Sequence, residues 1–265
     1  MRMIYNHVKI RSLTETYFSI IMVFTLNDLS FKYAPKADYA LKQLSMSIDS
    51  ALITGLAGAN GSGKTTLIRI LLGQLIDIEG AYAIDGLPAS DAHGEMLHRY
   101  GIGYAPDDIL LDEYLTGYEI LDMVASMRKI PRRDFEADIK LFSENLRLED
   151  WFQKRQCRTY SSGMRRKTAL CLAYLGTPSY VVLDEPTNGL DPLSVYGLKI
   201  IIREKKSRGA GTLIASHILD FVEKTADECI LLCNGELSYQ GPIAAIKQAH
   251  NGAALEDIYF SLFSK

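Results

Sequence analysis

GANGSGKT, residues 58–65, is the stretch of sequence that decides the fold class. It fits the pattern GxxxxGK[ST], and it follows directly on the apolar run ALITGLA at 51–57. A helical pattern of apolar residues, GKTTLIRILLGQL, continues from it over 63–75. A buried strand, a glycine-rich turn and a helix in this order predict an α/β domain built on a parallel sheet.

The glycine-rich turn has the chemistry of a phosphate site. Gly58, Gly61 and Gly63 allow the backbone to bend so that its N–H groups surround phosphate oxygens, and the following helix offers its positive end. Lys64 adds a positive charge for the β and γ phosphates, and Thr65 offers a hydroxyl to Mg²⁺. A glycine-rich turn can simply join a strand to a helix, but the lysine and threonine in register favour a P-loop that binds ATP. The residues predicted to bind the nucleotide here are Gly58, Ala59, Asn60, Gly61, Ser62, Gly63, Lys64, Thr65 and Thr66.

The segments on both sides of this loop predict the rest of the fold. Upstream, TLNDLSFKY (25–33) alternates apolar and polar residues, as half-buried strands do. Downstream, YVVLDE (180–185) and TLIASH (212–217) alternate with helical patterns, and CILLCNGELSYQG (229–241) contains an Asn-Gly turn typical of a hairpin. The interval of about 110–175 is mostly helical in pattern. We therefore predict a P-loop NTPase core with a parallel sheet, an N-terminal antiparallel β subdomain and an inserted helical subdomain.

The first residues of the sequence are predicted to lie outside this domain. Residues 1–24 are interpreted as an N-terminal extension that is disordered or not translated, since the strand pattern begins only at Thr25. The apolar run YFSIIMVF (17–24) has the composition of a secretion signal, but no small-residue cleavage site accompanies it. We expect translation to start at Met22 and the ATPase domain to occupy 25–265.

Composition excludes several classes of function. The 265 residues carry a net charge of −3, without the excess of Lys and Arg that a general grip on nucleic acid requires, so no nucleic-acid partner is expected. The four cysteines lie in or beside apolar stretches and lack the spacing of a zinc site, which indicates reduced, buried thiols in a cytosolic protein. No apolar run reaches the roughly 18 to 20 residues that cross a bilayer, so a membrane pore would belong to another chain.

A second polar site follows the strand pattern at YVVLDEP (180–186). Adjacent carboxylates at the end of a buried strand are costly unless they meet a cation or a proton. Asp184 is predicted to bind Mg²⁺, directly or through water, and Glu185 is predicted to polarise the water that attacks the γ-phosphate. A solvated acidic strand end is the alternative, and the P-loop earlier in the chain favours the catalytic interpretation.

Several motifs in a common order resemble the ATP-binding cassette (ABC) family over nearly all of the chain from Thr25 onward. YSSGM (160–164) matches the family signature commonly written LSGGQ, while NGLD (188–191) and the pair SH (216–217) match two further family loops. Tyr33 matches the aromatic residue that stacks on adenine in this family. Taken alone, each motif has a plainer interpretation as a packed aromatic ring, a helix N-cap or a polar loop residue.

The resemblance assigns roles to the matching residues. Ser161, Ser162 and Gly163 would present a hydroxyl and backbone amides to the γ-phosphate held by the opposite subunit. His217 would contact the γ-phosphate as a switch, since an imidazole can donate a hydrogen bond to a phosphate oxygen. Asp191 would lie in the loop that crosses the dimer interface.

Two departures from the family pattern are present. IGYAPDD (102–108) places Asp107 where the family usually has glutamine, and there it is predicted to ligate Mg²⁺ or to orient water as part of the catalytic machinery. Asp107→Gln is accordingly expected to change the Mg²⁺ dependence of hydrolysis. In the signature, Ser162 and Met164 replace a glycine and a glutamine. Both departures are similar to exporter-type cassettes, so the resemblance implies export.

The resemblance also implies partners. Two chains, identical or different, would face head to tail, close when each ATP lies between the P-loop of one and the signature of the other, and reopen after hydrolysis. The expected partners are therefore ATP with Mg²⁺, a second nucleotide-binding subunit and an integral membrane permease, at the cytoplasmic face of the cell membrane. Two alternatives stay open: a soluble cassette ATPase that remodels ribosomes or nucleic acid, and an ATP-binding regulatory or immunity subunit.

Overall fold

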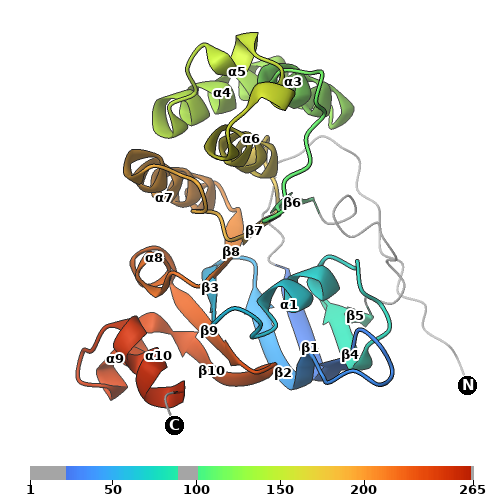
Figure 1. Ribbon diagram of the computed structural model, residues 1–265, viewed down its shortest axis with the longest axis vertical. Coiled ribbons are helices and arrows are strands. Elements are labelled where there is room, and N and C mark those ends of the chain that lie inside the picture. The colour runs from blue at the N-terminus through green and yellow to red at the C-terminus, as the bar shows by residue number, and fades with distance from the viewer. Residues whose placement is uncertain (1–21, 89–100, 264–265) are drawn as a thin grey trace, which may run out of the picture.

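Two β-sheets organise the computed structural model, which describes residues 22–88 and 101–263 (Figure 1). The first sheet is antiparallel, with the strand order β2 (Leu41–Asp49), β1 (Val23–Phe31), β4 (Glu79–Ile84) and β5 (Leu87–Pro88). The second has the order β10 (Glu236–Pro242), β9 (Glu228–Cys233), β3 (Ile53–Ala57), β8 (Gly211–Ser216), β7 (Tyr180–Asp184) and β6 (Ile102–Ala105). Its strands are parallel except for β10, which is antiparallel to β9.

The helices of the described residues fall into three groups along the chain. The first, α1 (Lys64–Leu71), follows β3. Between β6 and β7 the chain forms α3 (Gly117–Met127), α4 (Arg132–Leu146), α5 (Trp151–Lys154) and α6 (Ser162–Tyr174), with a 3-10 turn at Cys157–Thr159. The last group is α7 (Pro192–Ser207), α8 (Leu219–Thr225), α9 (Ile243–Ala249) and α10 (Leu255–Phe263). Figure 1 shows α3 to α6 gathered at the opposite end of the molecule from the antiparallel sheet.

Local sequence explains where several of these elements begin. A capping box starts α3, since the Thr116 hydroxyl accepts from the Glu119 N–H and the Glu119 carboxylate accepts from the Thr116 N–H. Asp191 caps α7, and Pro192 follows at the first helical position, where its missing N–H costs nothing. The five residues of β3 are all buried, as expected for a central strand of a parallel sheet.

The six-stranded sheet is covered on both faces. Alternate residues such as Leu56 and Val182 pack with α1 and the antiparallel sheet. Their neighbours, including Val181 and Ile214, pack with α3 to α7 on the other face. Because β3, β7 and β8 are parallel, the residues that follow these strands come to the same edge of the sheet.

The predicted fold class is confirmed, including the parallel sheet and the N-terminal antiparallel sheet. The Asn-Gly hairpin is also present, with positive φ angles at Asn234 and Gly235 between β9 and β10. One boundary differs: β1 begins at Val23 rather than at Thr25, because Val23 already pairs with Asp49 of β2. The predictions for residues 1–21 lie outside the described residues, so the start at Met22 and the domain limits stay predictions.

The described residues include several helices and all four cysteines. None of the helices within 22–88 and 101–263 combines the length and apolar character needed to cross a bilayer. Cys157, Cys171 and Cys229 are buried free thiols, and Cys233 is half-buried and also free.

Candidate functional site

The glycine-rich turn lies at the carboxyl edge of the parallel sheet. The last residue of β3, Ala57, pairs with Ser216 of β8, and Asp184 ends the neighbouring strand β7, so three strands deliver their following residues to one place. Gly63 has a φ of 105°, and a Cβ there would lie 2.6 Å from the Leu41 side chain. A larger residue is therefore excluded at the start of α1, where the chain turns into the helix.

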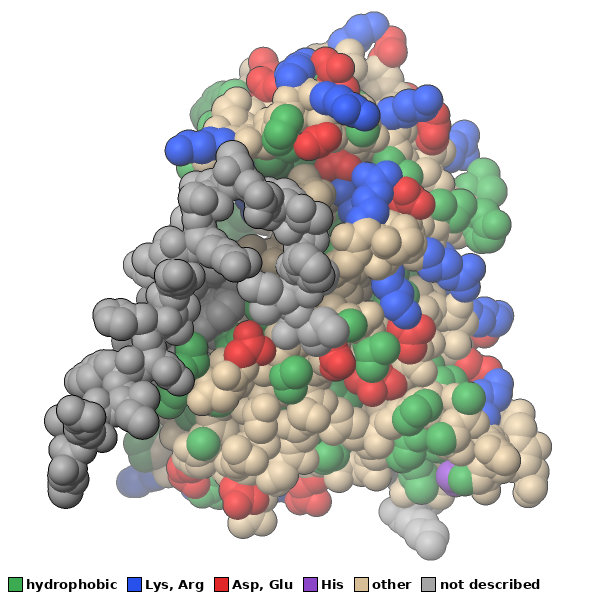
Figure 2. All heavy atoms as spheres, turned by 180° about the vertical axis from the view of Figure 1, so that it is seen from behind, with side chains coloured by type: hydrophobic (Ala, Val, Ile, Leu, Met, Phe, Trp, Pro, Cys, Tyr) green, Lys and Arg blue, Asp and Glu red, His purple; other side chains and the backbone are tan. Residues whose placement is uncertain are grey.

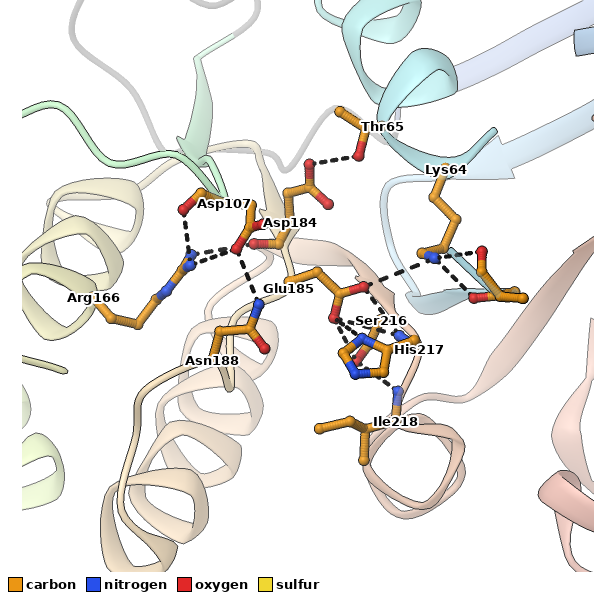
Figure 3. Close-up of polar contacts among 12 residues, drawn as sticks. Lys64, Thr65, Asp107, Arg166, Asp184, Glu185, Asn188, Ser216, His217 and Ile218 are labelled. Carbon is orange, nitrogen blue, oxygen red and sulfur yellow. Dashed lines mark hydrogen bonds and ion pairs between the residues drawn. The ribbon is translucent and has the colours of Figure 1, made fainter. Parts of the chain in front are cut away.

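The Lys64 side chain folds back over its own loop. Its Nζ donates to the carbonyl oxygens of Gly58 at 2.8 Å and Ala59 at 3.2 Å, and it lies 3.8 Å from a carboxylate oxygen of Glu185 (Figure 3). Burial lowers the pKa of Lys64, and the Glu185 and Asp184 carboxylates oppose that shift. The loop thus presents a buried ammonium group, for which the oxygens of a phosphate are suitable partners.

Thr65 and Asp184 form the part of the site that suits a cation. The Thr65 hydroxyl donates to Oδ2 of Asp184 at 3.1 Å, whereas Oδ1 is buried and has no hydrogen-bond partner among the described residues. Burial raises the pKa of Asp184, and the Thr65 hydrogen bond opposes this rise. Carboxylate and hydroxyl oxygens beside a phosphate site are the ligands that Mg²⁺ prefers. The two residues therefore fit a magnesium ion.

Glu185 is held in one orientation by the residues at the end of β8. Its Oε2 accepts a hydrogen bond from the Ser216 hydroxyl at 3.2 Å and lies 2.9 Å from Nδ1 of His217, while Oε1 accepts from the His217 N–H at 3.1 Å. The Glu185 backbone has a φ of 47°, in the left-handed region that is uncommon for a residue with a Cβ. The predicted catalytic base and the predicted switch histidine are therefore in direct contact.

Tyr33 lies just beyond β1, at the rim of the phosphate loop. Its hydroxyl is 3.0 Å from Oγ1 of Thr66 in the first turn of α1, and its ring packs edge-on against Phe31. The side chain is 56% exposed. An exposed aromatic ring tied to this helix is well placed to stack on a base, and its contact with adenine stays a prediction.

The signature segment begins α6. Ser161 is the N-cap, since its hydroxyl accepts from the Met164 N–H at 3.2 Å. A Cβ on Gly163 would lie 2.6 Å from the Gly189 carbonyl oxygen, so the signature and the turn after β7 are in close contact. The helix α6 packs on one face of the six-stranded sheet and α1 on the other. The exposed Ser161 and Ser162 therefore do not join the phosphate loop of their own chain.

Asp191 stabilises the start of α7. Its carboxylate accepts from the N–H of Ser194 at 3.0 Å and from the Ser194 hydroxyl at 2.7 Å, and it lies 3.4 Å from Nζ of Lys167 in α6. Chiefly because of the Ser194 hydroxyl, the pKa of Asp191 is well below its ordinary value. The NGLD loop is thus anchored to the signature helix as well as to its own helix.

Asp107 contacts the signature helix. Its Oδ1 accepts from Nη2 of Arg166 at 2.8 Å and from Nδ2 of Asn188 at 3.0 Å (Figure 3). The Arg166 guanidinium also donates to the carbonyl oxygens of Pro106 and Asp184. Magnesium coordination by Asp107 stays a prediction, and the hydrogen bonds that the structure gives its carboxylate are to Arg166 and Asn188.

The structure brings most of the predicted site residues together. One cluster at the carboxyl edge of the sheet contains Lys64, Thr65, Asp184, Glu185 and His217. Tyr33 and Asp107 lie at its borders, and Ser161, Ser162 and Gly163 lie apart on α6.

Sequence reasoning gave no role to several residues that contact this site, among them Arg166 and Tyr259. Arg166 follows the signature in the run RRK. The signal that could have found it is the need for a cation to balance the charge of Asp107. Tyr259 of α10 accepts a hydrogen bond from the Ala59 N–H at 2.8 Å, although 200 positions separate the two residues. The sequence around Tyr259 carries no local pattern that predicts this contact.

Comparison with known sequences places these features in a family. A model of the family described as ABC transporter matches residues 41–188. The ABC-type transporter ATP-binding protein EcsA of Bacillus subtilis is 32% identical over 228 residues, covering 84% of this chain and 90% of that protein. NatA of the same organism, an ABC transporter ATP-binding protein, is 28% identical and covers 89% and 96%. Two uncharacterised ABC transporter ATP-binding proteins, from Synechocystis and Nostoc, are 34% and 35% identical, and the chain spans 58% and 62% of their lengths.

Solved structures agree with the sequence relatives. An ATP-binding subunit of an ABC transporter superposes with a TM-score of 0.79 at 30% identity, covering 91% of this chain and 99% of that one. A bacterial Atm1-family ABC exporter with ATP bound shares the fold, with a TM-score of 0.76 at 20% identity over 93% of this chain and 42% of the exporter.

Proposed function

Because this chain belongs to the ABC transporter family and contains the ATP-binding domain of that family, we propose that it hydrolyses ATP with Mg²⁺ as the nucleotide-binding subunit of a transporter. In this proposal the energy of hydrolysis drives export through a separate membrane permease. The family implies ATP binding and hydrolysis, whereas the permease and the direction of transport are the further steps proposed here.

The observation that carries this proposal is the cluster at the carboxyl edge of the sheet. The ammonium of Lys64, the Thr65–Asp184 pair and the oriented carboxylate of Glu185 meet beside the glycine-rich turn. Phosphoryl transfer requires a positive charge on the phosphate oxygens, a cation ligand and a group that orients water, and each of these is present.

The described side chains divide the chemistry among them. Water attacks the γ-phosphorus, the bond to the bridging oxygen of ADP breaks, and Glu185 accepts the proton that the water loses. The Ser216 hydroxyl and the His217 N–H keep the Glu185 carboxylate from turning away. Lys64 neutralises charge on the phosphate oxygens, and His217 would donate a hydrogen bond to them.

Thr65 and Asp184 are the proposed protein ligands of magnesium. Once bound, the ion would supply positive charge to the β and γ oxygens. The buried Oδ1 of Asp184 would gain the partner that it lacks among the described residues. This supports a site that is more stable with the metal bound than without it.

A second copy of the cassette is proposed to complete each nucleotide site. The signature residues Ser161, Ser162 and Gly163 begin a helix on the opposite face of the sheet from α1, which supports the proposal that they meet the ATP of another subunit. ATP would then stabilise the closed pair because it contacts both subunits only in that state.

The helical end of the molecule is proposed to face the permease. Leu110, Tyr114 and Met127 in this region are exposed apolar side chains, which are suited to a protein contact. Lys and Arg are interspersed with Asp and Glu over this end in Figure 2. The similarity to transporter ATP-binding proteins such as EcsA supports a membrane partner, and the YSSGM signature supports export.

Glu185→Gln tests the proposal. The amide cannot accept the proton from water, so ATP hydrolysis should fall at least a hundredfold while ATP binding persists, and ATP should convert the protein to a stable dimer in size-exclusion chromatography with light scattering. Glu204→Gln, which changes a partly exposed glutamate near the end of α7, should behave as wild type. A Glu185→Gln protein that stays monomeric at saturating ATP would contradict the paired-site proposal.

A further inference from the structure

We propose that Arg166 is a positioning residue that fastens the signature helix to the end of β7, and that Asp107 serves as its counter-ion rather than as a magnesium ligand. The inference rests on the proposed function, because it assigns to both residues a part in the same ATPase cycle. The Arg166–Asp107 contact lies on the opposite side of β7 from the Thr65–Asp184 pair.

The contacts of Arg166 join three segments of the chain. Its side chain is 4% exposed. Nη1 donates to the carbonyl oxygens of Pro106 at 2.7 Å and Asp184 at 3.2 Å, and Nη2 donates to the carbonyl oxygen of Asp107 at 3.0 Å and to its carboxylate at 2.8 Å. The guanidinium is planar and its donors have set directions, so α6 cannot shift against the ends of β6 and β7 without breaking several of these bonds.

Charge explains why a carboxylate stands at position 107. A buried guanidinium is costly unless an anion lies beside it, and Asp107 is the acidic side chain bonded to Arg166. A glutamine at 107 would offer an acceptor but no charge. Asn188 donates to the same oxygen and connects the pair to the turn that contacts Gly163.

This network links the two halves of a composite nucleotide site. Arg166 lies one helical turn beyond Ser162, so its position sets where the signature end of α6 points. The Arg166 guanidinium also donates to the backbone carbonyl oxygen of Asp184. The side chain of Asp184 is proposed to bind the magnesium that accompanies the chain's own nucleotide. Arg166 would therefore fix the position of the signature relative to the magnesium site on the same chain, while the signature itself contacts the ATP bound by the partner subunit.

The test is a double-mutant cycle on steady-state ATP hydrolysis by the full-length protein, with Arg166→Gln, Asp107→Asn and the double variant. Arg166→Gln should lower kcat by roughly tenfold, a factor that corresponds to about 1.4 kcal/mol and lies within the coupling measured for contacting pairs. Asp107→Asn should lower kcat severalfold, and the double variant should be no slower than Arg166→Gln. The KM for ATP and the Mg²⁺ concentration at half-maximal rate should stay at the wild-type values.

Matched controls use the neighbouring residues Arg165 and Asp108, which line the same surface pocket as the pair. Arg165→Gln and Asp108→Asn should retain near wild-type kcat. If Arg166→Gln does not fold, Arg166→Lys replaces it in the cycle, since lysine keeps the charge but cannot make the forked contacts.

Two results would overturn the inference in an active protein: kcat losses that multiply in the double variant, or a Mg²⁺ requirement that rises in Asp107→Asn alone. The second result would restore the metal role of Asp107. A wild-type protein that does not hydrolyse ATP would instead overturn the proposed function, and this inference with it.

Discussion

At the scale of single residues, the site keeps Glu185 and Asp184 in environments that stabilise the protein poorly. Glu185 has a left-handed backbone, a conformation that costs of order 1–3 kcal/mol for residues with a side chain. The preceding residue, Asp184, which ends β7, buries a carboxylate oxygen without a hydrogen-bond partner among the described residues. Such features persist where function requires them, because the surrounding sheet supplies the compensating stability.

Asp184→Asn should therefore stabilise the nucleotide-free protein at neutral pH. Burial raises the pKa of Asp184 in the folded state above its ordinary value of 3.8. The contribution of this carboxyl group to the free energy of unfolding is therefore fully present only below pH 3.8, and it is lost as the pH rises through the raised pKa. We expect Asp184→Asn to raise the thermal midpoint by a few degrees at pH 7.5, since about 1 kcal/mol corresponds to about 2–4 °C in a chain of this size.

The gap between wild type and Asp184→Asn should close as the pH approaches 4, and the variant should lose ATP hydrolysis. Differential scanning fluorimetry across pH measures this, with Asp108→Asn as a control on an exposed carboxylate. An Asn variant that is less stable than wild type at every pH would refute the burial argument.

At the scale of elements, a buried ion pair fastens α4 to α7. Nζ of Lys205 donates to Asp138 at 2.6 Å and to the Gly176 carbonyl oxygen at 2.9 Å, and the two charged side chains are 2% and 3% exposed. The helices also approach closely, because a Cβ on Gly197 would lie 1.8 Å from the Asn145 carbonyl oxygen. The helical insertion is thus tied to the helix that begins with Asp191.

Lys205→Met should destabilise the protein by about 3–5 kcal/mol, because it leaves the Asp138 carboxylate buried without its partner. Urea denaturation gives the free energy of unfolding. Lys206→Met is the matched control, since the neighbouring Lys206 forms a partly exposed pair with Asp227, which is worth about 0–1 kcal/mol. Equal losses in the two variants would argue against a special role for the buried pair.

The C-terminal helix α10 contributes to the phosphate loop through Tyr259. Its hydroxyl is the acceptor for the Ala59 N–H, so Tyr259→Phe should lower the free energy of unfolding by about 1 kcal/mol and weaken ATP binding severalfold. Isothermal calorimetry measures the second effect. Tyr196→Phe, on an exposed tyrosine of α7, should leave both quantities at the wild-type values. Unchanged ATP affinity in Tyr259→Phe would limit the contact to a structural role.

At the scale of the whole molecule, the two ends of the structure are proposed to serve different partners. The proposed nucleotide site lies at the carboxyl edge of the parallel sheet, and α3 to α6 lie at the opposite end of the molecule from the antiparallel sheet (Figure 1). Closure of a pair of such molecules around ATP would move the helical ends relative to each other, which is the motion that a permease could use.

Fractionation of native host cells tests this arrangement. The chain should sediment with the membrane fraction and be released by high salt, because the proposed attachment is a protein contact whose ion pairs salt screens. An integral membrane protein, which stays in the membrane fraction after carbonate extraction, serves as the control that this fraction is recovered completely. Sedimentation with ribosomes after detergent treatment would contradict the membrane partner and favour a ribosome-associated ATPase.

The sequence by itself determined the features that are encoded locally. The GANGSGKT turn lies between its own strand and helix, and the YVVLDE run places Asp184 and Glu185 at a strand end, so both sites could be predicted from adjacent residues. The Asn-Gly hairpin and the parallel sheet follow from patterns of the same short range.

Only the tertiary structure decided which distant residues meet. Asp107 and Arg166 are 59 positions apart and Ala59 and Tyr259 are 200 apart, and periodicity within a segment carries no information about contacts at such distances. The placement of α1 and α6 on opposite faces of one sheet likewise depends on how the helices cover it. Packing of the sheet therefore decided that Asp107 faces the signature helix and that Ser161 does not face its own phosphate loop.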